Sequence, residues 1–140
     1  MSVSRRSLLV FAAAVLAFAL PVAAQTPRST YETAGAYYLA YRAAYDKAKT
    51  IDELAPWMSK ARRDEIAKET ADGRNEMFDL IQMFDDFTNV KVLKQTKTTA
   101  GAELHVEGVS ANKSRSDGVV ALVKEGTAWR IDKESWKGGL

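Results

Sequence analysis

The sequence predicts an α+β domain in which helices in the first half of the chain cover an antiparallel sheet in the second half. Residues 119–123 form an unbroken apolar run that favours a strand covered on both faces, and an alternating segment follows the turn at Gly126. Residues 29–84 instead place apolar side chains at steps of three and four, as amphipathic helices do. Because a sheet with an apolar face needs a cover, we expect the helices to pack on it.

The first 24 residues have the pattern of a cleavable export signal. Arg5 and Arg6 precede a run of 13 apolar residues, 8–20, and small residues follow, so the mature chain is expected to begin at Gln25. The run is shorter than the roughly 20 residues of a membrane-spanning helix. We therefore expect a periplasmic or secreted protein without a membrane anchor after cleavage. The adjacent arginines fit either a twin-arginine signal or an ordinary leader.

The mature part is expected to be a short tether, residues 25–28, followed by a single domain, residues 29–140. The chain has 20 basic and 18 acidic residues, and the leader holds two arginines and no acid, which leaves 18 of each sign. This balance argues against nucleic-acid binding, which needs a basic footprint. No cysteine and one histidine argue against disulfides and zinc, and no cofactor is predicted.

Four helices are expected before the sheet, over residues 29–49, 50–58, 59–69 and 74–84. Ser29 with Glu32 has the spacing of a capping box and predicts the start of the first helix. Thr50 with Glu53 has the same spacing at the start of the second. Ser59 is the predicted cap of the third helix, and residues 72–73, Asp-Gly, are predicted to break the chain before the fourth.

The adjacent acids Asp85 and Asp86 end the fourth predicted helix. Acids at a helix C-terminus oppose its macrodipole, so some fraying is expected there. Such a pair could act as a metal ligand or as a base. No second acidic or histidine cluster lies near the pair in the sequence, so no metal site is predicted.

The first two strands are expected over residues 89–97 and 102–109, and a polar loop, 111–117, leads into the final hairpin. In the second strand Leu104 and Val106 share one face, while Glu103, His105 and Glu107 share the other. Because the aliphatic side chains are the better core residues, His105 is expected to face outward. An inward His105 would instead be a candidate general base flanked by carboxylates.

The first helix carries an unusual stripe of tyrosines, with Tyr38, Tyr41 and Tyr45 following Tyr31 at helical steps. The rings could pack on the sheet while the hydroxyls reach water or a backbone carbonyl. They could also line a ligand cavity. The first interpretation is favoured, because a tyrosine needs only one hydrated end.

The order of these elements and three local features resemble small exported members of the nuclear transport factor 2-like superfamily. The features are an alanine- and tyrosine-rich first helix, a Leu-x-x-Trp-Met-Ser segment at residues 54–59, and the final hairpin. The residues that carry them include Tyr37, Tyr38, Ala40, Ala44, Glu125, Gly126, Trp129, Ile131 and Trp136. The resemblance implies a long first helix lying across a curved four-stranded antiparallel sheet that forms a cone. Members of this superfamily often form homodimers through the outer sheet face, so the resemblance implies that a homodimer is one possible state of this chain.

This superfamily hosts isomerases, dehydratases and binding modules without catalysis, so the resemblance does not decide the function. The leading hypothesis is an exported non-enzymatic binding or accessory module for a small apolar ligand or a periplasmic protein, with no catalytic residues assigned. The candidate pocket residues are Tyr38, Tyr41, Tyr45, Trp57, Phe84 and Trp129. The alternative is an isomerase- or dehydratase-type enzyme that uses Tyr38, Tyr41, Asp86 or His105. A third possibility is a purely structural homodimer through the sheet.

Overall fold

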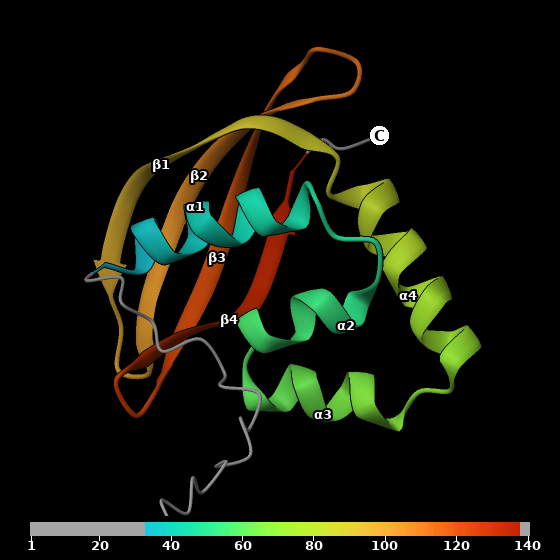
Figure 1. Cartoon of the computed structure of the whole chain (residues 1–140). Coiled ribbons are helices and arrows are strands. Elements are labelled where there is room, and N and C mark those ends of the chain that lie inside the picture. Colours follow the sequence, from blue (N-terminus) through green and yellow to red (C-terminus); the bar gives the residue numbers. More distant parts are fainter. Residues whose placement is uncertain (1–32, 138–140) are drawn as a thin grey trace, which may run out of the picture.

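The computed structural model describes residues 33–137, which form a helical layer followed by one antiparallel sheet. The strands lie in the order β1-β2-β3-β4. The elements are α1 (Ala34–Tyr45), α2 (Ile51–Leu54), the 3-10 helix η1 (Ala55–Trp57), α3 (Lys60–Lys68), α4 (Ala71–Phe84), β1 (Phe87–Lys97), β2 (Gly101–Ser110), β3 (Arg115–Glu125) and β4 (Ala128–Trp136). In Figure 1 the sheet curves around α1, and α2, α3 and α4 lie to one side of it. The predicted α+β class, with helices on a curved antiparallel sheet, is confirmed.

Helix α1 begins later and ends earlier than predicted. Thr33 is extended, and its side-chain oxygen accepts from the amide of Ala36 at 3.1 Å, so the helix starts at Ala34. It ends at Tyr45 instead of near Lys49. The predicted cap at Ser29, the tether and the leader lie outside the described residues.

The second predicted helix forms as two short pieces, α2 and η1. Thr50 stands at the N-cap position but makes no side-chain hydrogen bond to the helix. The carboxylate of Glu53 instead accepts from the amide of Lys49 at 3.3 Å. The capping box predicted at Thr50 is therefore wrong, because neither of its two hydrogen bonds forms.

The cap predicted at Ser59 is confirmed, whereas the break predicted at residues 72–73 is wrong. Helix α4 begins at Ala71, three residues before the predicted Arg74. The hydroxyl of Thr70 accepts from the amide of Gly73 at 3.1 Å. Gly73 therefore lies in a capped first turn, where its flexibility costs little.

The sheet has one covered face and one open face. On β2 Leu104 and Val106 are buried, and His105 points outward with its side chain 50% exposed, as predicted. On β3 Val120 and Leu122 are buried, but the alternate positions 119, 121 and 123 are partly exposed. The prediction that this strand is covered on both faces is therefore wrong, because the helices cover only the inner face.

The core lies between α1 and the covered face of the sheet. Its side chains with almost no exposed surface include Tyr37, Tyr38, Leu54, Met58, Leu104, Val106, Val120, Leu122 and Ile131. The segment between η1 and α3 runs along the edge of β4, where Met58 forms a parallel bridge to Ile131 and the amide of Ser59 donates to the Ile131 carbonyl at 2.8 Å. This pairing places the start of α3 beside β4. Among the described helices, none has the length and apolar character required to cross a membrane.

Candidate functional site

Helices α1, α3 and α4 and strand β4 surround a pocket that opens to solvent, here called the Tyr41 pocket. Its volume is about 320 Å³, within the range of small-molecule sites. Its lining residues are Tyr41, Arg62, Leu80, Ile81, Phe84, Asp85 and Glu134. One wall, from α4, is apolar, and the remaining side chains are polar. An apolar wall with a few convergent polar groups is typical of a ligand site.

Glu134 on β4 is held rigidly at one side of the Tyr41 pocket. Its Oε1 accepts from the Tyr38 hydroxyl at 2.7 Å, the Trp136 indole at 2.9 Å and Nη1 of Arg42 at 3.4 Å. The Arg42 and Glu134 side chains are only 6% and 4% exposed. Because each buried charge has a partner of opposite sign, the pair is tolerated in the core.

Arg42 also fixes the backbone at Asp85 and Phe87. Its Nη2 donates to the carbonyls of Asp85 and Phe87 at 3.0 Å each. The amide of Asp85 closes α4 by donating to the Ile81 carbonyl at 2.8 Å, and the Tyr45 hydroxyl donates to the same carbonyl at 3.2 Å. The backbone of Asp85 is therefore anchored, while its side chain lines the Tyr41 pocket.

Three polar side chains of the Tyr41 pocket have no protein partner within residues 33–137. The Tyr41 hydroxyl, the Asp85 carboxyl and the Arg62 guanidinium make no hydrogen bond or ion pair there. Tyr41 is only 2% exposed, and Asp85 and Arg62 are half-buried. None of these three groups is among the buried side-chain atoms that lack a hydrogen-bond partner, which within the described residues are Oγ of Ser116 and Nε of Arg130. The three groups therefore face the open pocket, where a ligand can replace water as their partner.

The electrostatics of the Tyr41 pocket favour a protonated carboxyl near neutral pH. Burial raises the pKa of Asp85 to about 7, and the nearby Glu134 carboxylate adds to this rise, although Arg42 and Arg62 oppose it. Burial also raises the pKa of Tyr41, so its phenol stays protonated at all physiological pH values. Asp85 can therefore both donate and accept a proton near pH 7.

The six predicted pocket residues do not share one cavity. Tyr41 and Phe84 line the Tyr41 pocket together. Tyr38 and Tyr45 lie in the core, where their hydroxyls bond to Glu134 and to a backbone carbonyl. This agrees with the favoured interpretation of the tyrosine stripe for those two rings, whereas Tyr41 matches the other interpretation.

The two predicted tryptophans do not line the Tyr41 pocket, although the Trp57 ring lies beside the Tyr41 ring with centroids 6.3 Å apart. Trp57 packs on Tyr37 with ring centroids 5.3 Å apart, and the Tyr37 hydroxyl donates to the Trp57 carbonyl at 2.9 Å. Trp129 lines a separate hollow of about 430 Å³ beside the turn between β1 and β2. The Lys124 ammonium lies 4.7 Å from the centre of the Trp129 ring. Trp57 therefore packs beside Tyr41 without lining its pocket, and Trp129 lines a different hollow.

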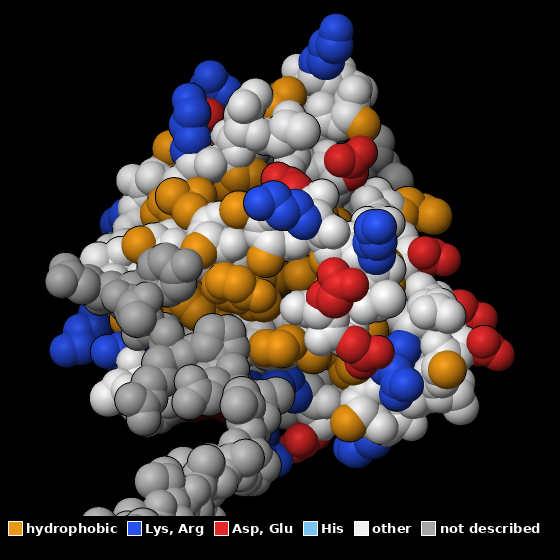
Figure 2. Space-filling model, in the orientation of Figure 1, with side chains coloured by type: hydrophobic (Ala, Val, Ile, Leu, Met, Phe, Trp, Pro, Cys, Tyr) orange, Lys and Arg blue, Asp and Glu red, His pale blue; other side chains and the backbone are white. Residues whose placement is uncertain are grey.

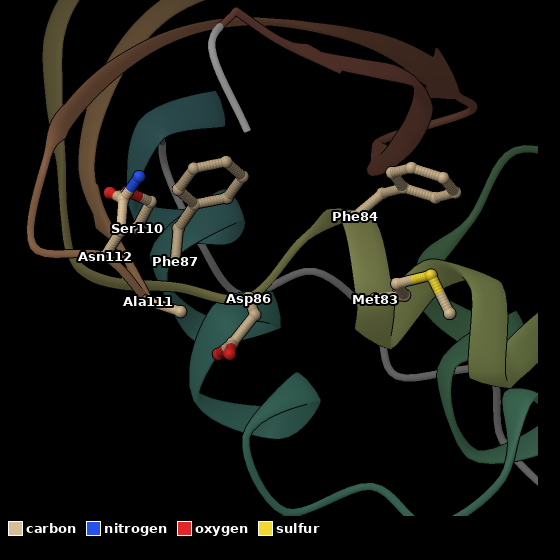
Figure 3. A pocket seen from close by; sticks show the side chains of 7 residues that line it. All are labelled: Met83, Phe84, Asp86, Phe87, Ser110, Ala111 and Asn112. Carbon is tan, nitrogen blue, oxygen red and sulfur yellow. The ribbon is translucent and has the colours of Figure 1, made fainter. Parts of the chain in front are cut away.

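Asp85 and Asp86, adjacent in the sequence, line different hollows. Asp86 is exposed and lines a hollow of about 190 Å³ between the end of α4 and the β2–β3 hairpin. Figure 3 shows Phe84 and Met83 on one side of this hollow and Phe87 with residues 110–112 on the other, while Asp86 points away from Phe84. The alternative hypothesis named Asp86, but only Asp85 lies beside Tyr41.

The sequence analysis did not identify three of the polar pocket residues as site residues. Asp85 was noted only as one of an adjacent acidic pair. Arg62 lies in a basic group, residues 60, 62 and 63, that could indicate an anion site, but the acids at 64 and 65 favour a solvated helix face. Glu134 follows the alternation of a strand and has no distinguishing signal. The face in Figure 2 shows acidic and basic side chains interspersed among apolar ones.

The outer face of α4 exposes three large apolar side chains next to the Tyr41 pocket. Leu80, Met83 and Phe84 are 53%, 67% and 49% exposed. Two of the three, Leu80 and Phe84, also line the pocket. Part of the apolar surface of α4 is therefore available to a pocket ligand.

Within residues 33–137 no three histidine, aspartate or glutamate side chains are grouped so that they could hold a metal ion. Comparisons with protein-family models, with curated proteins and with solved structures found no match to this chain.

Proposed function

We propose that this chain is an exported, non-enzymatic binding module that holds a small ligand in the Tyr41 pocket. One observation carries the proposal: polar groups of Tyr41, Arg62 and Asp85, from three different elements, meet an apolar wall without a protein partner. Polar groups that face an open pocket without a protein partner can bond to a ligand in place of water. A ligand of this pocket would carry a polar head group and an apolar body.

The export part of the proposal is supported by the leader pattern in residues 1–24. Membership of the nuclear transport factor 2-like superfamily belongs to the same proposal. It is supported by the element order and by the position of α1 across a curved antiparallel sheet. A homodimer through the open sheet face would cover the partly exposed positions 119, 121 and 123. A monomeric mass at low micromolar concentration would remove the homodimer.

The binding proposal is tested by a ligand screen on residues 25–140. Small molecules with one polar head and one apolar body are added, and backbone amide signals are followed by NMR. We expect hits to shift the signals of Tyr41, Ile81 and Asp85. Tyr41→Phe, which removes only the hydroxyl, should weaken binding, and His105→Gln on the open sheet face should leave binding unchanged. Hits that shift only residues elsewhere would contradict the proposal.

A second candidate function, an isomerase- or dehydratase-type enzyme, is supported by one observation. Asp85 has a pKa of about 7 and lies beside the protonated Tyr41 phenol. A base that titrates near the working pH, next to a hydroxyl that can donate to a developing oxyanion, is suited to proton abstraction next to a carbonyl.

The enzymatic alternative has its own assay. Small ketones are incubated with the protein in D₂O, and deuterium uptake next to the carbonyl is measured. The enzyme hypothesis expects uptake above the buffer rate that is lost in Asp85→Asn and kept in Asp86→Asn. Uptake that is equal in both variants would exclude Asp85 as the base.

A further inference from the structure

The geometry points to a small organic acid as the ligand of the Tyr41 pocket, with its carboxylate facing Tyr41, Arg62 and Asp85 and its apolar body against α4. This inference rests on the proposed function and names the chemical class of that ligand. It follows from the hydrogen-bonding capacity of the polar groups, from the charge balance beside them and from the exposed apolar wall.

The unpartnered polar groups of the pocket are mainly hydrogen-bond donors. The Arg62 guanidinium can only donate, and the Tyr41 hydroxyl donates one hydrogen. A protonated Asp85 carboxyl adds a third donor. A ligand that matches this set must present several acceptor oxygens close together. A carboxylate does so, and its pairing with a guanidinium is among the stronger hydrogen-bonding arrangements in proteins.

Glu134, the other acid of the pocket, does not prevent an anion from binding. Its Oε1 already accepts from three donors, one of them the Arg42 guanidinium at 3.4 Å. The charges of Arg42 and Glu134 therefore cancel. When Asp85 is protonated, the remaining formal charge at the pocket is the single positive charge of Arg62. A ligand ammonium group would face this charge without a free carboxylate to balance it.

The apolar wall explains why the acid should have a hydrophobic body. Leu80 and Phe84 are half-exposed although they line a pocket, and Ile81 lies between them on α4. Covering apolar surface removes it from water and favours binding. An aryl or alkyl group on the acid would cover these side chains, whereas a bare inorganic anion would leave them exposed.

Binding of an anion at this place is coupled to the proton on Asp85. The charged and titratable side chains that face Asp85 come from α1, α3 and β4, and they are Tyr41, Arg42, Tyr45, Arg62 and Glu134. A carboxylate added to this group disfavours the ionised form of Asp85 further. The ligand therefore binds the form with protonated Asp85, and affinity should fall as the pH rises above about 7, by at most tenfold per pH unit.

The test uses residues 25–140 and three probes with the same body: 3-phenylpropionate, 3-phenylpropanol and 3-phenylpropylamine. Dissociation constants are measured by calorimetry at pH 6 and pH 8.5, and NMR identifies the amides that shift. We expect the acid to bind at least about tenfold more tightly than the other two at pH 6, and to bind several-fold more weakly at pH 8.5.

Two variants and one control separate the contributions of Arg62 and Asp85 to acid binding. Arg62→Gln should weaken acid binding at least about tenfold. Asp85→Asn should keep acid binding at pH 6 and lose most of its pH dependence, because asparagine still donates but does not ionise. Arg74→Gln removes the same charge from α4, outside the pocket, and should change nothing. Circular dichroism checks that each variant folds.

The outcomes distinguish the inference from the proposed function. If the alcohol or the amine shifts Tyr41, Ile81 and Asp85 and binds as tightly as the acid, the organic-acid inference is wrong and the binding proposal stands. If none of the three probes shifts these amides, both are contradicted. Acid binding that is insensitive to Arg62→Gln would also overturn the inference.

Discussion

One carboxylate oxygen, Oε1 of Glu134, joins the first described helix to the last strand. Tyr38 and Arg42 reach it from α1, and Trp136 reaches it from its own strand. All of these donors are in or next to the core, where a lost partner cannot be replaced by bulk water. Burial lowers the pKa of Arg42, but Glu134 and the nearby phenols raise it by more, so the guanidinium stays charged. Glu134 and its three donors therefore form one buried polar cluster that connects α1 to β4.

Glu134→Ala should be strongly destabilising. It leaves a buried guanidinium, a buried phenol and an indole without their shared acceptor, and breaking a buried ion pair costs about 3–5 kcal/mol. The free energy of unfolding in urea measures this loss. Glu103→Ala is the control, because Glu103 is exposed and pairs only with His105 at 3.3 Å. A loss below about 1 kcal/mol is expected for the control, and equal losses in the two variants would contradict the role given to Glu134.

Asp85→Asn should stabilise the protein at high pH and leave it unchanged at low pH. Its pKa of about 7 in the folded state lies above the value of about 3.9 expected in the unfolded chain. The folded state therefore holds the proton more tightly, and ionisation of Asp85 opposes folding as the pH rises from about 4 to about 7.

The variant lacks this ionisation, so at pH 8 its free energy of unfolding should exceed that of the parent by roughly 1–2 kcal/mol, allowing for solvent screening of a half-buried group. The difference should vanish near pH 4. Urea unfolding at pH 4, 6 and 8 measures it. Asp86→Asn, an exposed neighbour, controls for the loss of one carboxylate. A variant less stable than the parent at pH 8 would show that Asp85 is stabilising when ionised.

At the scale of elements, glycines on β2 and β3 leave space for the ring of Trp136. Gly108 on β2 and Gly118 on β3 lie under the Trp136 ring, and a Cβ atom on Gly118 would stand 2.8 Å from that ring. The ring stacks on Phe87 with centroids 4.1 Å apart. The missing side chains therefore allow the indole to lie flat and to reach Glu134.

Gly118→Ala should displace the Trp136 ring and destabilise the protein by about 1–3 kcal/mol, the usual cost of overpacking. Chemical denaturation measures the loss, and a shift of the tryptophan emission maximum reports the displaced ring. Gly126→Asn is the matched control at a turn with φ of +65° and no atom within 4 Å of the new Cβ. It should cost less than about 1 kcal/mol, because asparagine tolerates this conformation. If both substitutions cost the same, close packing is not the reason for the glycine.

The elements also show how far the sequence could predict the fold. The alternation of apolar and polar residues predicted the inner face of β2 correctly, because the aliphatic side chains of Leu104 and Val106 are more stable when buried. The residue at which a helix begins was harder to predict. Ser29 and Thr33 are both suitable N-cap residues, and the local sequence does not show which of them caps α1. The same applies at α4, where Thr70 supplies a cap that includes Gly73 in the helix.

The site could not be predicted because it is a property of the whole molecule. Tyr41, Arg62, Asp85 and Glu134 come from four segments that the fold brings together, and the bond from Ser59 to β4 places α3 among them. Tyr41 was among the predicted pocket residues because it belongs to a periodic stripe. Arg62 and Asp85 each have a neighbour of the same charge in the sequence, Glu134 follows a lysine, and only the fold places these three beside the pocket.

Stability should be distributed unevenly over the whole molecule, with α4 as its least protected large element. Of the 14 residues of α4 only Phe78 is buried, and its outer face exposes Leu80, Met83 and Phe84. Strands β2 and β3 instead pair on both sides and supply the centre of the core. Segments with few buried contacts open with lower free energies than core strands. The wall of the Tyr41 pocket is therefore also the part of the fold expected to open first.

Hydrogen exchange followed by mass spectrometry checks this gradient on residues 25–140. Peptides from α4 should exchange before those from β2 and β3, and saturating 3-phenylpropionate should slow exchange in α4 while leaving the two strands unchanged. The reason is that a ligand seated on Ile81 and Phe84 binds the closed form and not the opened one, which adds its binding free energy to local stability. Tyr41→Phe should reduce the ligand effect without changing the ligand-free order. Protection of α4 equal to that of β2 in the free protein would show that the helix is held by more than Phe78 and its cap contacts.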